Sequence, residues 1–338
     1  MLYLALAKYR ELLLAGIIVV LVLLVGLRNP VFLLPSNLLD IVNDTAILAI
    51  LAAGMMCVLL IGSIDISVSA NLALSGMAVA LVMRNNLDIV EAVDGAIKVS
   101  TPLPLLLLLG IGVGLLVGLI NGLLIAKGRL LPIIATLGMQ YIARAICFLI
   151  SRGDWVRKHQ MSTAMDQLTR TPILGLSSLI WIAALVYGGL YLWITYKRSG
   201  RALYAVGSNV EAASVRGIPV DRAKITAHAI LGALAGLAGL LWISRYGSAA
   251  HDTATGFELS VIASCVLGGV AVSGGAGKLL GVLLGAMLIG VINNALPMLR
   301  VSSFWKMTIQ GGMILVAILS NVALRRMTDR QNLARREI

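Results

Sequence analysis

Residues 103–126 read LPLLLLLGIGVGLLVGLINGLLIA and contain no charged side chain. An α-helix needs about 20 consecutive apolar residues to cross the hydrocarbon core of a bilayer. This stretch is long enough, and only its glycines, one proline and Asn121 interrupt the run of aliphatic side chains. We therefore predict that it forms a membrane-spanning helix.

The same length criterion, applied outward along the chain, predicts an all-α, polytopic transmembrane helical bundle of about ten segments. The expected segments are 11–28, 43–62, 67–83, 103–126, 131–150, 174–196, 224–244, 258–273, 278–298 and 305–324. The third and eighth are shorter than a full crossing, and glycine, serine or aspartate interrupts the joins beside them. We expect broken or re-entrant helices at these two places.

The composition excludes a water-soluble protein. Hydrophobic residues make up 59% of the chain and charged residues 12%, and the mean hydropathy is +0.96. Soluble domains carry roughly 25% charged residues. The net charge of +12 does not indicate a nucleic-acid partner, because the basic residues lie in short loops and aromatic residues are only 5% of the chain.

The distribution of basic residues predicts the orientation. With the N- and C-termini in the cytoplasm, sixteen lysines and arginines lie in inside loops and ten in outside loops. This topology leaves a long inside loop at 197–223, a basic cytoplasmic tail at 325–338 and outside loops at 84–102 and 151–173. We expect an uncleaved first span and one transmembrane domain over residues 1–338, with no fused soluble domain.

Glycines at four-residue spacing predict close helix packing. They recur at Gly110, Gly114, Gly118 and Gly122, at Gly232 and Gly236, and at Gly281 and Gly285. Small residues at this spacing lie on one helix face and allow two backbones to approach closely in lipid.

The first candidate motif is GSIDISVS at residues 62–69. A carboxylate that joins two apolar segments is costly unless it is capped, paired or hydrated. We expect Asp65 or Ser67 to cap the following helix after a break at Gly62. The alternative is ion or proton coupling by Asp65, although no basic partner is evident in the sequence.

The second motif is LGGVAVSGGAGK at residues 267–278. Its Gly-Lys end resembles a phosphate-binding loop, but that motif requires a glycine at position 272 and a serine or threonine at position 279. The chain has Val272 and Leu279 instead. We interpret the run as a flexible break between two helices, formed by Gly268, Gly269, Gly274 and Gly275.

The third motif lies in the inside loop and reads GSNVEAASVRGIPV at residues 207–220. Ser208 followed by Glu211 is a capping-box pattern, and Arg216, Gly217 and Pro219 are typical of a helix end. A helix of about two turns is too short to be stable alone. We expect Asn209, Ala212 and Ala213 within it to help present a surface to another protein, the alternative being a solvated helix packed on its own bundle.

Nothing in the sequence indicates catalysis, a metal or a cofactor. The three histidines, His159, His228 and His251, are far apart, and no nucleophile has a base at a recognisable spacing. The three cysteines lie in apolar runs, and we expect them to be small packing residues. His228 lies within an apolar segment and is expected to be a hydrogen-bonded packing residue.

Together these motifs resemble the permease family of ribose-type ABC importers, whose relatives import pentoses, hexoses, rhamnose or autoinducer-2. The resemblance covers nearly the whole chain. It depends on residues 62–69, 207–220 and 267–277, on Ala-Thr-Leu-Gly at 135–138 after Pro132, and on Gly-Phe-Glu-Leu at 256–259. Ser63 and Ser69 stand where the family usually has glycine.

The resemblance implies a location in a bacterial inner membrane, and it implies partners and roles. The expected partners are two cytoplasmic ATP-binding subunits, a second permease copy or paralogue, a periplasmic solute-binding protein and a small sugar. The helix from Ser208 to Arg216 would couple to the ATPase, the breaks near Asp65 and Gly274 would gate the path, and outside loops such as 247–258 would meet the binding protein.

The sequence does not single out the residues that line the translocation path. Asn121, Gln140, Tyr141, Asn293 and Asn294 could line it, because sugar sites need hydrogen-bonding and flat side chains, but such residues also join helices to one another. An ion-coupled secondary transporter of a small polar solute is the alternative function. It usually needs several carboxylates or basic residues within the membrane, and the clear mid-span candidate here is Arg144.

Overall fold

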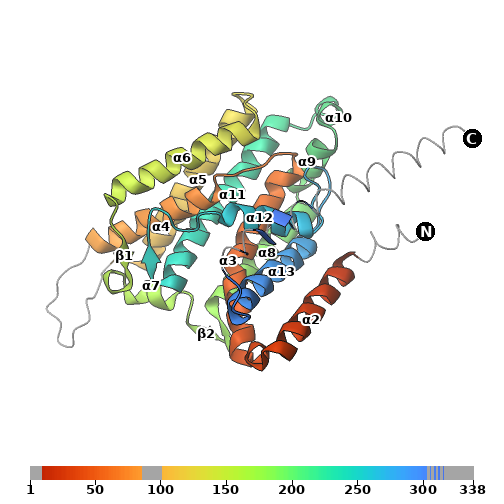
Figure 1. Cartoon of the computed structure of the whole chain (residues 1–338). Coiled ribbons are helices and arrows are strands. Elements are labelled where there is room, and N and C mark those ends of the chain that lie inside the picture. Colours follow the sequence, from red (N-terminus) through yellow and green to blue (C-terminus); the bar gives the residue numbers. More distant parts are fainter. Residues whose placement is uncertain are drawn as a thin grey trace, which may run out of the picture.

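The computed structural model describes residues 10–85 and 101–302, together with residues 305, 308, 309, 311, 312 and 315. The helices of the described chain surround a central helix, α3 (Figure 1). They are α2 (Arg10–Arg28), η1 (Pro30–Leu33), α3 (Pro35–Leu60), α4 (Val68–Asn85), α5 (Leu103–Ala126), α6 (Pro132–Ser151), η2 (Lys158–Gln160), α7 (Thr163–Gln167), α8 (Ser178–Tyr196), α9 (Arg198–Ser208), α10 (Val210–Val215), α11 (Val220–Tyr246), α12 (Phe257–Leu267) and α13 (Leu279–Met298). Most of the predicted segment 305–324, the tail 325–338 and most of the loop 84–102 lie outside the described residues.

Seven of the described helices are long and apolar enough to cross a membrane: α2, α3, α5, α6, α8, α11 and α13. The third and eighth predicted segments are shorter helices, α4 and α12, as expected. The first nine predicted segments therefore each correspond to a helix, and the chain is a polytopic helical membrane protein. The eighth ends six residues before its predicted end, at Leu267, because the glycine-rich run begins there. The second begins eight residues earlier than predicted, at Pro35, because a proline suits the first turn of a helix. Its added turns carry Asp40, which pairs with Arg245 as Asp44 does.

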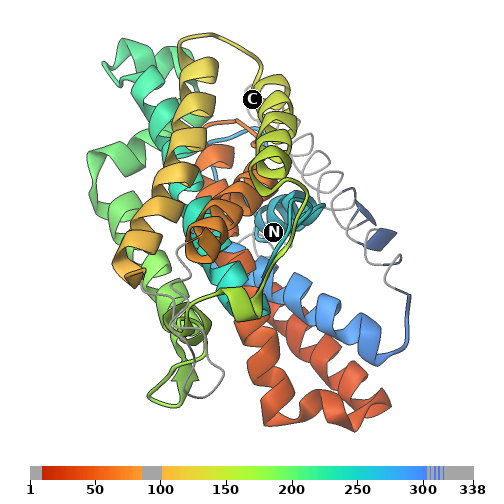
Figure 2. The ribbon, with the colours of Figure 1, turned by 90° about the vertical axis from the view of Figure 1, so that its left-hand side faces the viewer.

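Helix α3 forms the core. Every residue from Thr45 to Leu60 is buried, and α8, α11, α12 and α13 pack against it. A separate apolar cluster joins α2 and η1 to the start of α3 and to α13, on one side of the molecule (Figure 2). It is centred on Phe32, which is completely buried.

The predicted glycine stripes hold α5 and α11 together. A Cβ on Gly114 would lie 2.3 Å from the carbonyl oxygen of Gly232, and one on Gly118 would lie 2.3 Å from that of His228. In the same way, a Cβ on Gly281 would lie 2.0 Å from the carbonyl oxygen of Gly268. Because no side chain fits at these contacts, the glycines set the distance between the helices.

The loops gather at two ends of the bundle. Short antiparallel strands pair β1 (Val156–Arg157) with β4 (Ser248–Ala249), so two loops predicted to lie outside meet at one end. Strands β2 (Pro172–Ile173) and β3 (Leu176–Ser177) form a hairpin before α8. Helices α9 and α10 lie at the opposite end, at the top of Figure 1. This grouping agrees with the predicted loop assignment, while the direction of the chain across the membrane stays a prediction.

Candidate functional site

The helical chain breaks between α3 and α4, as predicted. Ile61 caps the end of α3, and Gly62 follows with a φ of +71°, a conformation that glycine adopts without strain. The next five residues are not part of a helix, and α4 begins at Val68. Since five different helices contribute to or contact this break, irregular backbone here is covered by protein rather than by lipid.

Asp65 organises the break through one of its carboxylate oxygens. Oδ1 accepts hydrogen bonds from the backbone N–H of Ser67 at 2.9 Å and from the Ser67 hydroxyl at 2.6 Å. The prediction that Asp65 or Ser67 caps α4 needs correction, because Asp65 bonds the residue before the helix and the Ser67 hydroxyl donates to Asp65. The carboxylate thus shapes the turn that leads into α4.

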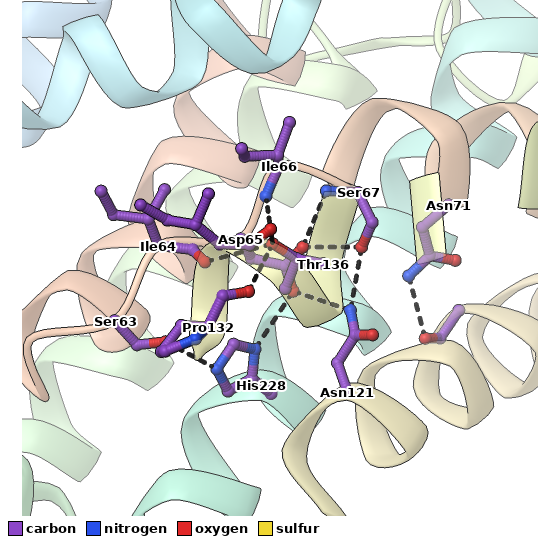
Figure 3. Close-up of polar contacts among 12 residues, drawn as sticks. Ser63, Ile64, Asp65, Ile66, Ser67, Asn71, Asn121, Pro132, Thr136 and His228 are labelled. Carbon is purple, nitrogen blue, oxygen red and sulfur yellow. Dashed lines mark hydrogen bonds and ion pairs between the residues drawn. The ribbon is translucent and has the colours of Figure 1, made fainter. Parts of the chain in front are cut away.

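The other oxygen of Asp65 binds two helices. Oδ2 lies 3.1 Å from Nδ1 of His228 on α11 and accepts a hydrogen bond of 3.1 Å from the side-chain amide of Asn121 on α5 (Figure 3). Nε2 of His228 lies 3.1 Å from the hydroxyl of Ser63. His228 and Asn121 are completely buried and Asp65 is 3% exposed. We call Ser63, Asp65, Ser67, Asn121 and His228 the Asp65 cluster.

His228 corrects one sequence-based argument and confirms another. The sequence offered no evident basic partner for Asp65, but His228 supplies one from 163 positions further along the chain. His228 is also the buried, hydrogen-bonded packing residue that was predicted. No local pattern could have paired the two, because only the folding of α11 against the break brings them together.

Helix α6 closes the break from another side. The hydroxyl of Thr136 accepts a hydrogen bond from the backbone N–H of Ile66 at 3.2 Å, and it lies 2.9 Å from the carbonyl oxygen of Pro132 (Figure 3). In α4, the amide of Asn71 donates to the carbonyl oxygen of Gly114 on α5 at 3.0 Å. The residues on both sides of Asp65 are therefore fixed by neighbouring helices.

The predicted short helix in the 197–223 loop is α10. Its N-cap is Asn209, whose side chain accepts a 2.8 Å hydrogen bond from the N–H of Ala212. The expected capping box at Ser208 and Glu211 is wrong, because Ser208 is the last residue of α9. The end of α10 agrees with the sequence, with Arg216 at the C-cap and Gly217 at a φ of +75°.

Almost the whole surface of α10 is free of its own bundle. Ala213 is its one buried residue, and Val215 is 89% exposed. The alternative expectation was a loop helix packed on its own bundle. Of the residues of α10, Ala213 alone is packed in this way. Because a helix of six residues is too short to be stable alone, its exposed surface is a candidate contact for another protein.

All three sequence motifs meet where α9 ends, because a Cβ on Gly274 would lie 2.8 Å from the backbone nitrogen of Gly62 and 2.9 Å from the carbonyl oxygen of Gly207. A Cβ on Gly207 would lie 1.7 Å from the carbonyl oxygen of Leu60 and 2.5 Å from the backbone nitrogen of Gly275. The same N–H of Gly275 donates a 2.9 Å hydrogen bond to the carbonyl oxygen of Leu60. We call this contact of Leu60, Gly207 and Gly275 the backbone junction.

The glycine-rich run forms the break that was predicted. Gly268 caps the end of α12, and Gly269, Gly274 and Gly275 have positive φ angles of 94°, 89° and 78°. Tyr204 on α9 donates a 2.9 Å hydrogen bond to the carbonyl oxygen of Gly277. Burial raises the pKa of the Tyr204 phenol, which keeps this donor protonated.

Comparison with known proteins places these features in a family. Residues 37–318 match the family model described as the permease component of a branched-chain amino acid transport system. The chain belongs to this family. The ribose import permease protein RbsC of Escherichia coli strain K12 is 34% identical over 305 residues, which cover 89% of this chain and 90% of that protein.

Other relatives of the permease are named for different solutes. The L-arabinose ABC transporter permease protein AraH of Azospirillum brasilense is 33% identical over 90% of this chain and 86% of its own length. The autoinducer 2 import system permease protein LsrC of Escherichia coli is 32% identical over 94% of this chain and 90% of its own length. No solved structure matches the chain. The protein is a transport subunit, as its relatives are, and the resemblance inferred from its motifs is confirmed.

The predicted path residues do not form one group in the permease. Only Asn121 belongs to the Asp65 cluster. Gln140 and Tyr141 lie on α6, where Gln140 is half-buried and Tyr141 is 71% exposed. Asn293 and Asn294 are half-buried near the end of α13. Their roles in transport stay predictions.

Proposed function

We propose that this permease forms the translocation path of an ATP-driven importer for a monosaccharide or sugar-like solute. Two cytoplasmic ATP-binding subunits would supply the energy, a second permease copy or paralogue would complete the path, and a periplasmic binding protein would deliver the solute. The relatives named for ribose, L-arabinose and autoinducer 2 support this substrate class.

The backbone junction carries the proposal. Helix α10 is exposed. Gly207, two positions before the N-cap Asn209, is in backbone contact with the end of α3 and with the glycine-rich break. A partner that pushes on α10 would therefore displace both interruptions of the bundle together. Rigid-body motion of this kind is an established way to convert a local event into domain closure.

Helix α11 gives a second connection between α10 and the break that joins α3 to α4. It starts at Val220, four residues after Arg216, and carries His228 into the Asp65 cluster. Motion of α10 would reach the α3–α4 break from two sides, through Leu60 and through Asp65. On this proposal α10 is the coupling helix, and the breaks at Asp65 and Gly274 are the moving parts of the gate.

The ion-coupled alternative rests on the buried Asp65. A coupling carboxylate must exchange its partners during transport, whereas Asp65 is held by Ser67, Asn121 and His228 at once. We therefore assign Asp65 to holding the break and expect the energy to come from ATP-binding subunits.

Co-purification tests the proposal. The tagged permease, extracted from its host in mild detergent, should retain an ATP-binding subunit, and Glu211→Ala and Arg216→Ala on α10 should weaken that retention. Asp252→Ala, at the opposite end of the bundle, is the matched control and should retain the subunit as the wild type does. Absence of an ATP-binding subunit under every mild extraction would overturn the proposal.

A further inference from the structure

The first two residues of α2 contact both ends of the glycine-rich break. Nη2 of Arg10 donates a 3.1 Å hydrogen bond to the carbonyl oxygen of Val266 and lies 3.5 Å from that of Leu267, where α12 ends. Oε1 of Glu11 lies 2.8 Å from Nζ of Lys278, the residue directly before α13. Two consecutive side chains thus hold the chain just before and just after the glycines. We call these contacts the α2 anchor.

The guanidinium of Arg10 suits the end of α12 for a physical reason. The last carbonyl groups of a helix carry a partial negative charge and lack donors within the helix, so a cation stabilises them. The contact also requires a glycine, because a Cβ on Gly269 would lie 3.0 Å from Cζ and from Nη1 of Arg10. Gly269 has a φ of +94°, so the same glycine turns the chain and leaves room for the guanidinium.

Polar contacts are important at this end of α2, because few of its side chains are buried there. From Arg10 to Leu24, Leu14 is the one buried residue. The later turns of α2 belong to the apolar cluster around Phe32, which also contains the start of α3 and part of α13. Helix α2 therefore connects the glycine-rich break at one end to the start of α3 at the other.

Between the two contacts of the α2 anchor, the break contains a closed loop. The backbone N–H of Ala271 donates a 2.8 Å hydrogen bond to the carbonyl oxygen of Ala276, which ties the two ends of this loop together. Gly275 lies within the loop and belongs to the backbone junction at the end of α9. On either side of the loop lie Gly269 and Gly277, which give the chain freedom to turn.

We propose that Arg10 and Glu11 are positioning residues for transport, which hold the two ends of the break while α9 moves its closed loop. With the ends held, a displacement at Gly275 turns the loop about Gly269 and Gly277. Without the α2 anchor, the same displacement would shift α12 and α13 as well, so less of it would open the path. The role in transport rests on the proposed function, whereas the anchor itself does not.

Hydrogen exchange of the full-length permease, in detergent with its co-purified subunits, tests the anchor without transport. The amides of Gly269 and Val270 donate to carbonyl oxygens of α12, so their exchange reports how often this end of the break opens. Arg10→Ala should speed this exchange about tenfold or more, the factor that corresponds to a lost hydrogen bond to a charged group. Arg28→Ala, at the exposed other end of α2, is the matched control and should exchange as the wild type does. Equal exchange in Arg10→Ala and wild type would overturn the anchor.

A charge exchange at the second contact keeps the anchor testable if Arg10→Ala fails to fold. The side chain of Lys278 is 71% exposed and that of Glu11 24%, so substitutions here should not prevent folding. Glu11→Lys should speed exchange at the amide of Val282, which donates to the carbonyl oxygen of Lys278, by about twofold to fivefold. Adding Lys278→Glu to the same protein should restore the slow exchange. If the double variant exchanges as fast as Glu11→Lys, the pair does not hold the break.

Uptake and ATP hydrolysis by the assembled importer show whether the anchor serves transport. The probes are radiolabelled D-ribose, L-arabinose and D-glucose, each supplied to vesicles with ATP. Arg10→Ala should lower the sugar taken up per ATP hydrolysed about threefold or more, and Arg10→Lys, which keeps the positive charge, should recover part of the loss. Arg28→Ala should keep the wild-type ratio.

The outcomes separate the anchor from the function. Faster exchange with an unchanged ratio of uptake to hydrolysis in Arg10→Ala would overturn the positioning role. If wild-type vesicles take up no probe, the proposed function and the positioning role fail together, while hydrogen exchange still decides the anchor. If the wild type imports sugar and Arg10→Ala changes neither exchange nor the ratio, the inference fails alone.

Discussion

Replacement of Gly207 by alanine is the most informative perturbation of the backbone junction. The new Cβ would lie 1.7 Å from the carbonyl oxygen of Leu60 and 2.5 Å from the nitrogen of Gly275, whereas non-bonded carbon atoms prefer about 3.5–4.0 Å. Both neighbours are backbone atoms, so neither can rotate away. The end of α9 must therefore separate from α3 by more than a typical packing adjustment.

The cost follows from what this separation breaks. The 2.9 Å hydrogen bond from Gly275 to Leu60 cannot survive it. A buried polar group left without its partner costs about 1–3 kcal/mol, and overpacking adds about 1–3 kcal/mol. We expect G207A to destabilise the junction by about 2–6 kcal/mol. The helices α9 and α10 should then move without carrying the α3–α4 break with them.

The assay measures coupling as well as stability. In proteoliposomes that hold the assembled importer, G207A should keep ATP hydrolysis but lose most sugar uptake, and its thermal midpoint in detergent should fall. Gly188→Ala on α8 is the matched control, because a Cβ there would meet nothing within 4 Å. If G207A keeps both the wild-type midpoint and the wild-type ratio of uptake to hydrolysis, the junction does not transmit motion and this reasoning is refuted.

Three further predictions concern the cap of α10, the Asp65 cluster and the glycine stripe. Asn209→Ala should cost about 1 kcal/mol of helix stability and weaken retention of the ATP-binding subunit, while Ser208→Ala should not, as pull-down would show. His228→Ala should destabilise the protein by about 3–5 kcal/mol in thermal unfolding, because it leaves Asp65 buried without its partner, and Asp65→Asn should recover part of that loss. Gly114→Ala should separate α5 from α11 and lower the thermal midpoint, because its Cβ would lie 2.3 Å from a carbonyl oxygen.

Each of these has an outcome that contradicts it. If the Asn209→Ala protein retains the ATP-binding subunit as well as the wild type does, the cap of α10 does not contribute to docking. Strict additivity of the His228 and Asp65 substitutions would mean that the pair is not coupled. Gly112→Ala, where a Cβ meets nothing within 4 Å, should leave the midpoint unchanged, and an equal fall in both glycine variants would refute close packing as the cause.

The spans and the helix packing could be predicted because they depend on local features. Apolar length identified the first nine segments, and glycine spacing on 110–122 identified the face that meets α11. The positions of the two breaks were also evident, since Gly62 and Gly274 supply conformations that other residues rarely adopt. These signals need no knowledge of distant parts of the chain.

The polar partners could not be predicted, because they depend on contacts between distant segments. His228 looks like an isolated polar residue in an apolar run, and only the packing of α11 on α5 brings it to Asp65. At the start of α10, Ser208 and Asn209 are both good capping residues, and the sequence pattern selected the wrong one. The backbone junction has no side chain that could mark it, because two of its three members are glycines.

ATP-dependent uptake is the most direct test of the central claim. The permease, its co-purified ATP-binding subunits and a sugar-loaded binding protein would be reconstituted in vesicles without an ion gradient. We predict that sugar accumulates with ATP and stops when the ATP-binding subunits are omitted. Uptake by the permease alone, driven by an ion gradient and indifferent to ATP, would contradict the account and establish an ion-coupled transporter instead.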